Sequence, residues 1–173
     1  MINNKNIAYI DGQNLYGGTS ETEPKWSIDY KKFRRYLSEK YNVNVAYYYL
    51  GFKDEKYQSL YDGLEEAGFE LRFREHSASM ISNKKGNVDT DIVFDIMHSF
   101  IKSKHRRKVV LVSGDGDYIK TVRFLMGENL LEKVLLPNRN YASSLYRQLP
   151  SDKYDYLDNS SVRRKIEYVR KRK

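Results

Sequence analysis

Aspartates that follow predicted strands are the residues of this chain best suited to chemistry. Asp115 and Asp117 come directly after the β-branched run Val109–Val112, and such runs bounded by turn residues are typical of buried strands. Asp11 follows a second such run, residues 6–10. Because ligands bind outside the carboxyl ends of parallel strands, we expect the three carboxylates to share one sheet edge. Tight-turn chemistry is the competing explanation of Asp11.

A predicted helix supplies a fourth carboxylate. Apolar residues recur at helical spacing over residues 88–103, and at about 100° per residue Asp89 falls within their stripe. Asp91 falls on the opposite side of the helix, and Asp95 nearly so. Because the helix precedes a strand, a right-handed crossover brings its N-terminus to the same sheet edge. Capping of the first helical turn is the alternative explanation of Asp89.

These aspartates have no matching histidine or cysteine cluster, so they would form a hard oxygen site that suits Mg²⁺ or Mn²⁺ rather than zinc. An acidic site repels bare phosphate, so a metal ion would have to bind between the carboxylates and the phosphate. Such an ion would activate water and stabilise the transition state of phosphodiester cleavage. Ile119 occupies the last glycine position of a G-x-G-x-x-G motif, and no P-loop motif occurs. The histidines at 76, 98 and 105 lack metal-ligand spacing.

Predicted strands and helices alternate along the chain. This alternation indicates an α/β fold, a three-layer sandwich with a central, mostly parallel five-stranded sheet. The strands are expected at residues 6–10, 43–50, 69–74, 109–112 and 131–136, with a further short strand at 154–157. Helices are expected from Ser27, after Asp54, over 88–103 and after Asp117. The polar stretch 17–25 indicates an exposed loop that could gate the site.

Size and charge narrow the class of protein. The 173 residues fit one domain with a full hydrophobic core. The formal net charge of +8 favours a polyanionic partner, because Lys and Arg gain affinity by releasing counterions from phosphates. The chain has no cysteine, which excludes disulfides and suits a reducing cytoplasm. No apolar run approaches the roughly 18 residues of a membrane span, so we expect a cytoplasmic protein without membrane contact.

Basic residues concentrate near the C-terminus. Residues 160–173 are expected to form a basic helix or tail that carries most of the net charge. We interpret it as an electrostatic clamp on nucleic acid, and a solvated helix or disordered tail is the alternative. Nucleic-acid contacts are expected from Lys84, Lys85, Lys120, Arg163, Arg164 and Lys165.

Three sequence blocks point to a known family. They are YIDGQNL at 9–15, KGNVD at 85–89 followed by Asp95, and VSGDGDY at 112–118. They resemble the blocks of the NYN domain, a PIN-like nuclease family that includes the LabA-like proteins. Residues 142–145 and 152–157 are similar to the closing block of that family. The resemblance spans roughly residues 5 to 158 and departs from the family pattern at Asn87, which is inserted before Val88.

The resemblance implies a PIN-like α/β fold with Rossmann-like topology, with a nuclease domain over residues 1–159 and the basic segment 160–173 after it. It also implies metal-dependent ribonuclease activity. The catalytic and metal-binding carboxylates would be Asp11, Asp89, Asp115 and Asp117. Supporting roles would fall to Asn14, Ser113 and Asp95, although the helical phase of Asp95 points away from the site.

We therefore predict a Mg²⁺- or Mn²⁺-dependent endoribonuclease that acts on single-stranded or structured RNA. The alternative is an RNA-binding or regulatory PIN-like module that keeps the acidic site but has little turnover. A phosphatase or nucleotide-binding protein with the same acidic edge is a third interpretation. A homodimer is compatible with the sequence.

Overall fold

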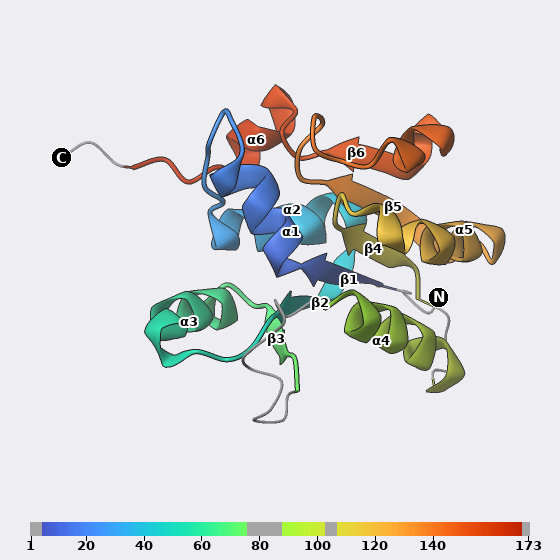
Figure 1. The fold of residues 1–173 in the computed structure, drawn as a ribbon, viewed down its shortest axis with the longest axis horizontal. Coiled ribbons are helices and arrows are strands. Elements are labelled where there is room, and N and C mark those ends of the chain that lie inside the picture. The colour runs from blue at the N-terminus through green and yellow to red at the C-terminus, as the bar shows by residue number, and fades with distance from the viewer. Residues whose placement is uncertain (1–4, 76–87, 103–106, 171–173) are drawn as a thin grey trace.

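A six-stranded parallel sheet forms the centre of the computed structural model, which describes residues 5–75, 88–102 and 107–170 (Figure 1). Its order is β3-β2-β1-β4-β5-β6. The strands are β1 (Asn6–Asp11), β2 (Val43–Leu50), β3 (Glu70–Phe73), β4 (Val109–Val112), β5 (Leu131–Leu136) and β6 (Tyr154–Tyr156). The chain builds outward from β1 to β3 and then crosses to β4 on the other side of β1. The direction of winding therefore reverses between β1 and β4, where doubly wound folds bind ligands.

Helices cover both faces of the sheet. The α-helices are α1 (Gly12–Tyr16), α2 (Tyr30–Tyr41), α3 (Gln58–Glu66), α4 (Asp89–Lys102), α5 (Ile119–Gly127) and α6 (Ser160–Ile166). The shorter turns are η1 (Gly17–Glu21), η2 (Glu55–Tyr57), η4 (Gly116–Tyr118), η5 (Ser144–Gln148) and η6 (Ser151–Lys153). Helices α1, α2, α3 and α6 pack into one hydrophobic cluster, and α4 and α5 into another. The three-layer arrangement is therefore confirmed.

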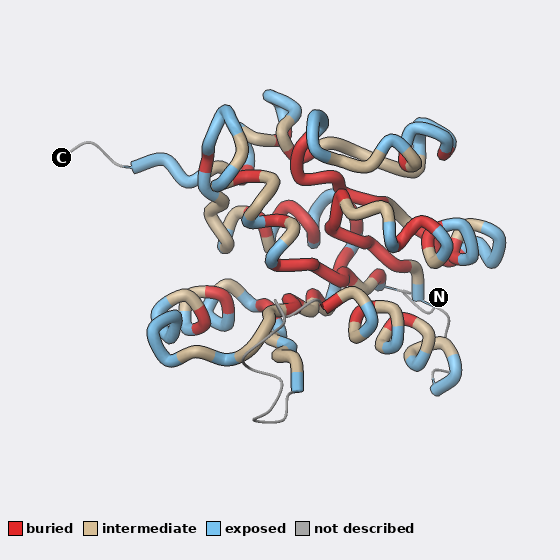
Figure 2. Tube along the Cα trace, in the orientation of Figure 1, coloured by how far each residue is buried: buried red, intermediate tan, exposed pale blue. Residues whose placement is uncertain are grey.

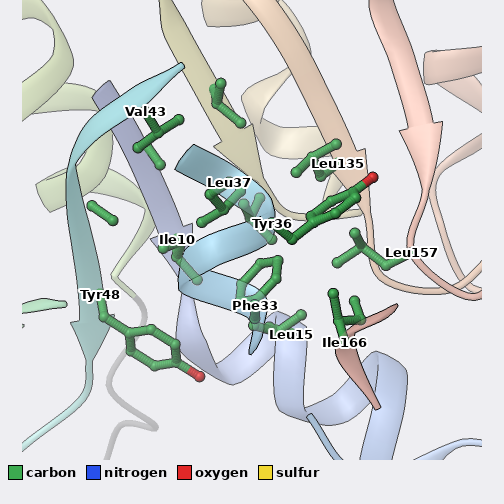
Figure 3. Close-up of a cluster of buried hydrophobic side chains, with 14 of the residues drawn as sticks. Ile10, Leu15, Phe33, Tyr36, Leu37, Val43, Tyr48, Leu135, Leu157 and Ile166 are labelled. Carbon is green, nitrogen blue, oxygen red and sulfur yellow. The ribbon is translucent and has the colours of Figure 1, made fainter. Parts of the chain in front are cut away.

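The two clusters are divided by the alternation of side chains along the strands. In β1, Ala8 and Ile10 face the first cluster, whereas Tyr9 faces the second. Ile10 packs there with Phe33 of α2 and Ile166 of α6 (Figure 3). Burial is concentrated in the central strands (Figure 2). Burial on both faces explains why β4 reads as an unbroken apolar run.

The sheet has six strands rather than five, because the short segment expected at 154–157 pairs with β5 as β6. The start of α2 also differs from the prediction. Asp29, not Ser27, caps this helix and accepts a hydrogen bond from the Lys32 amide at 3.0 Å. Ser27 lies outside the helix, and its carbonyl oxygen accepts the amide of Tyr168 at 2.8 Å.

The prediction of an exposed loop over residues 17–25 is wrong for Gly17–Glu21. These residues form a π-helix that continues α1, with Thr19 buried inside it. The Thr19 hydroxyl donates to the Leu15 carbonyl at 2.8 Å, which satisfies its polar group within the turn. The segment is consequently part of the packed structure.

The C-terminal segment contains a helix that is anchored in the core. Ile166 of α6 is fully buried and Val162 is 8% exposed, so α6 contributes apolar surface as well as charge. Backbone bonds join its end to the start of α2, where the Asp29 amide donates to the Ile166 carbonyl at 2.8 Å. Within the basic segment expected at 160–173, the structure has a helix over Ser160–Ile166.

No helix in the described ranges combines the length and the apolar character needed to cross a membrane.

Candidate metal centre

The carboxyl end of β1 presents Asp11 to the point where the winding of the sheet reverses. Its side chain is 4% exposed, caps α1 and accepts the Asn14 amide at 3.0 Å. Only glycine fits at position 12, because a Cβ there would lie 2.6 Å from the Tyr49 carbonyl oxygen. The side-chain oxygen of Asn14 in turn accepts the Gly114 amide at 2.7 Å. Asn14 therefore ties the end of β1 to the turn after β4.

The turn after β4 carries two further carboxylates. Ser113 is fully buried, its hydroxyl accepts the Asp115 amide at 3.1 Å, and it lies 3.4 Å from Asp11 Oδ2 as a donor. Asp115 caps η4 by accepting the Asp117 amide at 3.0 Å. These bonds fix the direction of the Asp115 side chain and hold the backbone of the turn that carries Asp117.

Tyr118 joins the carboxylates of two distant segments, and the sequence analysis gave it no role. Its buried hydroxyl lies 3.1 Å from Asp11 Oδ2 and 2.9 Å from Asp89 Oδ1. One hydroxyl carries one proton, so it can donate to only one of these oxygens at a time. The signal in the sequence is an aromatic residue at the end of an otherwise polar turn.

Four aspartates thus line one cavity of about 640 Å³, which we call the acidic pocket. They are Asp11, Asp89, Asp115 and Asp117. One carboxylate oxygen from each of the last three lies within 4.8 Å of the other two. Asp11 is the most buried of the four and stands beside this group of three.

The electrostatics of the acidic pocket favour a cation. Burial raises the pKa of Asp11, with Asp89 and Asp115 adding repulsion, while hydrogen bonds from Asn14 and Tyr118 act in the opposite direction. Burial also raises the pKa of Tyr118, so its hydroxyl stays protonated and remains a donor. No Lys or Arg occurs among the described residues that line the pocket. Three close carboxylates without a basic side chain fit a hard divalent cation.

Asp95 lies elsewhere, as its helical phase indicated. Its carboxylate accepts the Tyr49 hydroxyl at 2.6 Å and lines a separate cavity. Asp91 is half-buried and lines that second cavity too. The structure therefore separates Asp91 and Asp95 from the acidic pocket, although Asp89 on the same helix belongs to it.

The predicted nucleic-acid contacts are dispersed. Lys120 is exposed on α5 and does not line the acidic pocket. Arg163 is half-buried, stacks over Trp26 and pairs with Glu167 at 2.7 Å. Exposed positions on α6 are occupied by Arg164 and Lys165. Lys84 and Lys85 lie outside the described residues.

Comparisons with known proteins agree on the fold. A family model described as the NYN domain matches residues 6–152. Among solved structures, a crystal structure of a protein of unknown function from Vibrio parahaemolyticus is similar, with a TM-score of 0.71 and 24% sequence identity. The similarity covers 92% of this chain and 96% of that chain. The comparison with curated proteins found no match. None of these comparisons supports a homodimer.

Proposed function

Because the chain belongs to the NYN domain family of PIN-like nuclease folds, we propose that it is a Mg²⁺- or Mn²⁺-dependent endoribonuclease. The observation that carries the proposal is the group of three carboxylate oxygens, one each from Asp89, Asp115 and Asp117, within 4.8 Å of one another. They meet where the winding of the sheet reverses, which is the ligand-binding position of doubly wound folds.

The donor set suits the proposed metal. Carboxylate oxygens without nitrogen or sulfur are the ligands that Mg²⁺ and Mn²⁺ prefer. Asp89, Asp115 and Asp117 would hold the ion, and Asp11 would complete the site from its buried position beside them. A bound ion of this kind supplies a Lewis acid and a water molecule of lowered pKa.

The remaining residues orient this set. The Tyr118 hydroxyl lies within hydrogen-bond distance of both Asp11 and Asp89 and donates to one of them at a time, so it links the two carboxylates. Ser113 and Asn14 lock the turn after β4 against the end of β1. Preorganised ligands lose little conformational entropy when the ion and the substrate bind.

The acidic pocket and the basic surface have separate tasks in this proposal. The pocket repels phosphate until a cation is bound, so affinity for RNA has to come from basic residues outside it. Arg164 and Lys165 are exposed on α6 and are suited to contact the RNA backbone.

Incubation of labelled single-stranded RNA with the purified protein tests the proposal. We expect cleavage with Mn²⁺ or Mg²⁺, none with EDTA, and no hydrolysis of p-nitrophenyl phosphate. RNA binding without cleavage at any metal concentration would instead identify a regulatory PIN-like module. Preferential hydrolysis of p-nitrophenyl phosphate would identify a phosphatase.

A further inference from the structure

The acidic pocket extends well beyond its aspartates. One part of its lining, which we call the far half, consists of Glu21 at the end of η1, Thr22 directly after it, and Asn138 and Tyr141 of the loop after β5. The whole cavity measures about 640 Å³, within the roughly 300–1,000 Å³ typical of sites for small organic ligands. The pocket therefore has room for a nucleoside as well as for a metal ion.

Direct contacts hold the two walls of this far half together. The buried amide of Asn138 donates to the Gly18 carbonyl and to the Thr22 hydroxyl, both at 3.1 Å. A Cβ at Gly18 would lie only 2.6 Å from Pro137 Cβ, so this close approach requires glycine. The π-helix and the loop after β5 consequently form one fixed cleft.

Tyr141 presents its ring from this fixed loop. The backbone beside it is anchored, since the Ala142 amide donates to Asn138 at 3.0 Å and the Ser143 amide to Gly114 at 2.9 Å. The Tyr141 side chain is 64% exposed and makes no hydrogen bond or ring contact with any residue that the structure describes. An exposed ring on an anchored backbone is prepared to stack against a flat ligand at small entropic cost.

Charge decides which part of an RNA can occupy the far half. Glu21 is exposed there and forms no ion pair within the described part of the chain, and none of the described lining residues is basic. A phosphate would be repelled by this carboxylate, whereas a base or a ribose can donate N–H or O–H hydrogen bonds to it. The occupant that fits is the neutral nucleoside portion of a nucleotide.

We infer that Glu21 and Tyr141 form a nucleoside subsite in which Tyr141 stacks on the unpaired base next to the scissile phosphate. The inference rests on the proposed function, because the aspartates that line the same pocket would locate that phosphate. Base-paired RNA keeps its bases inside the helical stack, so the subsite selects single-stranded RNA.

Binding measurements with RNAs that lack single bases test the subsite. The probe is a short fluorescein-labelled single-stranded RNA, together with a series of otherwise identical RNAs that each lack one base. Affinities with Mn²⁺ are compared for Tyr141→Ala, Tyr141→Trp and the control Tyr57→Ala, all in the Asp115→Asn background to prevent cleavage. Tyr57 is also exposed, at 49%, but it does not line the pocket. Thermal unfolding of each variant excludes misfolding.

Loss of one stacked base corresponds to about a 5- to 140-fold weaker affinity. We expect Tyr141→Ala to weaken binding of intact RNA within that range, and Tyr141→Trp and Tyr57→Ala to leave it nearly unchanged. For one RNA in the series, the one that lacks the stacked base, the loss of the base should weaken binding to the protein that keeps Tyr141. The same loss should not weaken binding to Tyr141→Ala, because that variant has no ring to stack on the base. Equal effects of Tyr141→Ala and Tyr57→Ala on affinity would overturn the inference. It would also be overturned if the loss of affinity from Tyr141→Ala and the loss from a missing base were additive for every RNA in the series.

The two proposals fail in different ways. If the wild-type protein cleaves no RNA but the base-specific dependence on Tyr141 persists, the proposed catalytic function is wrong and the subsite stands. If RNA is cleaved but Tyr141→Ala binds every RNA as the control does, the function stands and the subsite is wrong.

Discussion

Tyr41 and Tyr118 are both buried and both donate to an aspartate, but the surroundings of the two carboxylates, Asp155 and Asp11, differ. Asp155 accepts the Tyr41 hydroxyl at 2.7 Å and lies 3.4 Å from Lys40 and 3.7 Å from Lys133. We call these four residues the Asp155 cluster. Asp11 accepts the Tyr118 hydroxyl at 3.1 Å, but it forms no ion pair with any described residue.

The difference separates a carboxylate whose charge is compensated by neighbouring lysines from one whose charge no described basic residue compensates. In the Asp155 cluster two lysines compensate the charge, and the negative group links α2 to the strands β5 and β6. In the acidic pocket, burial and neighbouring aspartates raise the pKa of Asp11. An arrangement that costs stability in the free protein is typical of functional sites, because a ligand offsets the cost.

The comparison predicts its largest effect for the charge of Asp115. Asp115→Asn keeps the shape of the side chain and removes a proposed metal ligand, so cleavage of RNA with Mn²⁺ should fall by at least about a hundredfold. The melting temperature should not fall. The matched control is Asp152→Asn, which removes a carboxylate that is 70% exposed and outside the pocket. Wild-type cleavage by folded Asp115→Asn would exclude Asp115 from the site.

A second prediction separates two aspartates on one helix. Asp89 lines the acidic pocket, whereas Asp91 lines the neighbouring cavity with Asp95. Asp89→Ala should lower the cleavage rate by at least about tenfold, which is the smallest effect expected when a metal site is altered. Asp91→Ala should change the cleavage rate by no more than about twofold. Single-turnover kinetics with saturating Mn²⁺ measure both. Equal losses of cleavage rate in the two variants would show that Asp89 is not a metal ligand distinct from Asp91.

The sequence was informative wherever a role depends on local pattern. Strand ends followed by acidic turns located Asp11 and Asp115, and helical phase separated Asp89 from Asp91. The structure brings the predicted aspartates to one pocket, and their roles as ligands stay predictions. The role of Tyr118 could not be predicted from the sequence, because it depends on how α4 and η4 pack against the end of β1. No local pattern encodes that long-range arrangement.

Long-range contacts also explain the other differences. Ser27 is as good a helix cap as Asp29 by residue type, but Ile28 forms a β-bridge with Glu167, which holds the chain extended before α2. In α6, Val162 and Ile166 have the i, i+4 spacing of a buried stripe. The surrounding arginines and lysines obscured that signal in the sequence.

A third prediction concerns stability, for which substitutions of Asp11 and Asp155 should give opposite signs. In EDTA at neutral pH, Asp11→Asn should raise the free energy of unfolding by about 1 kcal/mol, because it removes a buried uncompensated charge. Asp155→Asn should lower it by about 1–2 kcal/mol, because it removes a charge-assisted hydrogen bond between buried and half-buried groups. Urea denaturation measures both changes.

The pH dependence sharpens this contrast. The pKa of Asp11 is raised in the folded protein, so folding favours its protonated form, and the ionised form destabilises the fold as the pH rises. The advantage of Asp11→Asn should therefore shrink as the pH falls through the raised pKa of Asp11 and disappear by about pH 3, below the ordinary Asp pKa of about 3.9, where the wild-type carboxyl is protonated in both states. Destabilisation by Asp11→Asn at neutral pH would show that the acidic pocket is as well compensated as the Asp155 cluster.

The smallest predicted effect concerns the basic face of α6, which the proposal assigns to RNA. Deletion of the C-terminal segment cannot test this assignment, because it would also remove buried Ile166 and its backbone bond to Asp29. The double variant Arg164→Gln/Lys165→Gln removes two exposed charges and keeps the core. Each lost phosphate contact should lower the slope of log K against log salt by about 0.7 for single-stranded RNA, while single-turnover cleavage at saturating RNA stays unchanged.

The control for this variant is Lys31→Gln/Arg35→Gln on α2, which removes the same amount of charge from two other exposed positions. If α6 grips the RNA backbone, only the α6 variant changes the salt slope, because contact formation and not net charge releases the counterions. Equal changes in both variants would show that RNA responds to the overall charge of the protein. The basic face of α6 would then be a solvated surface, and the contribution of α6 would be the packing of Val162 and Ile166 in the core.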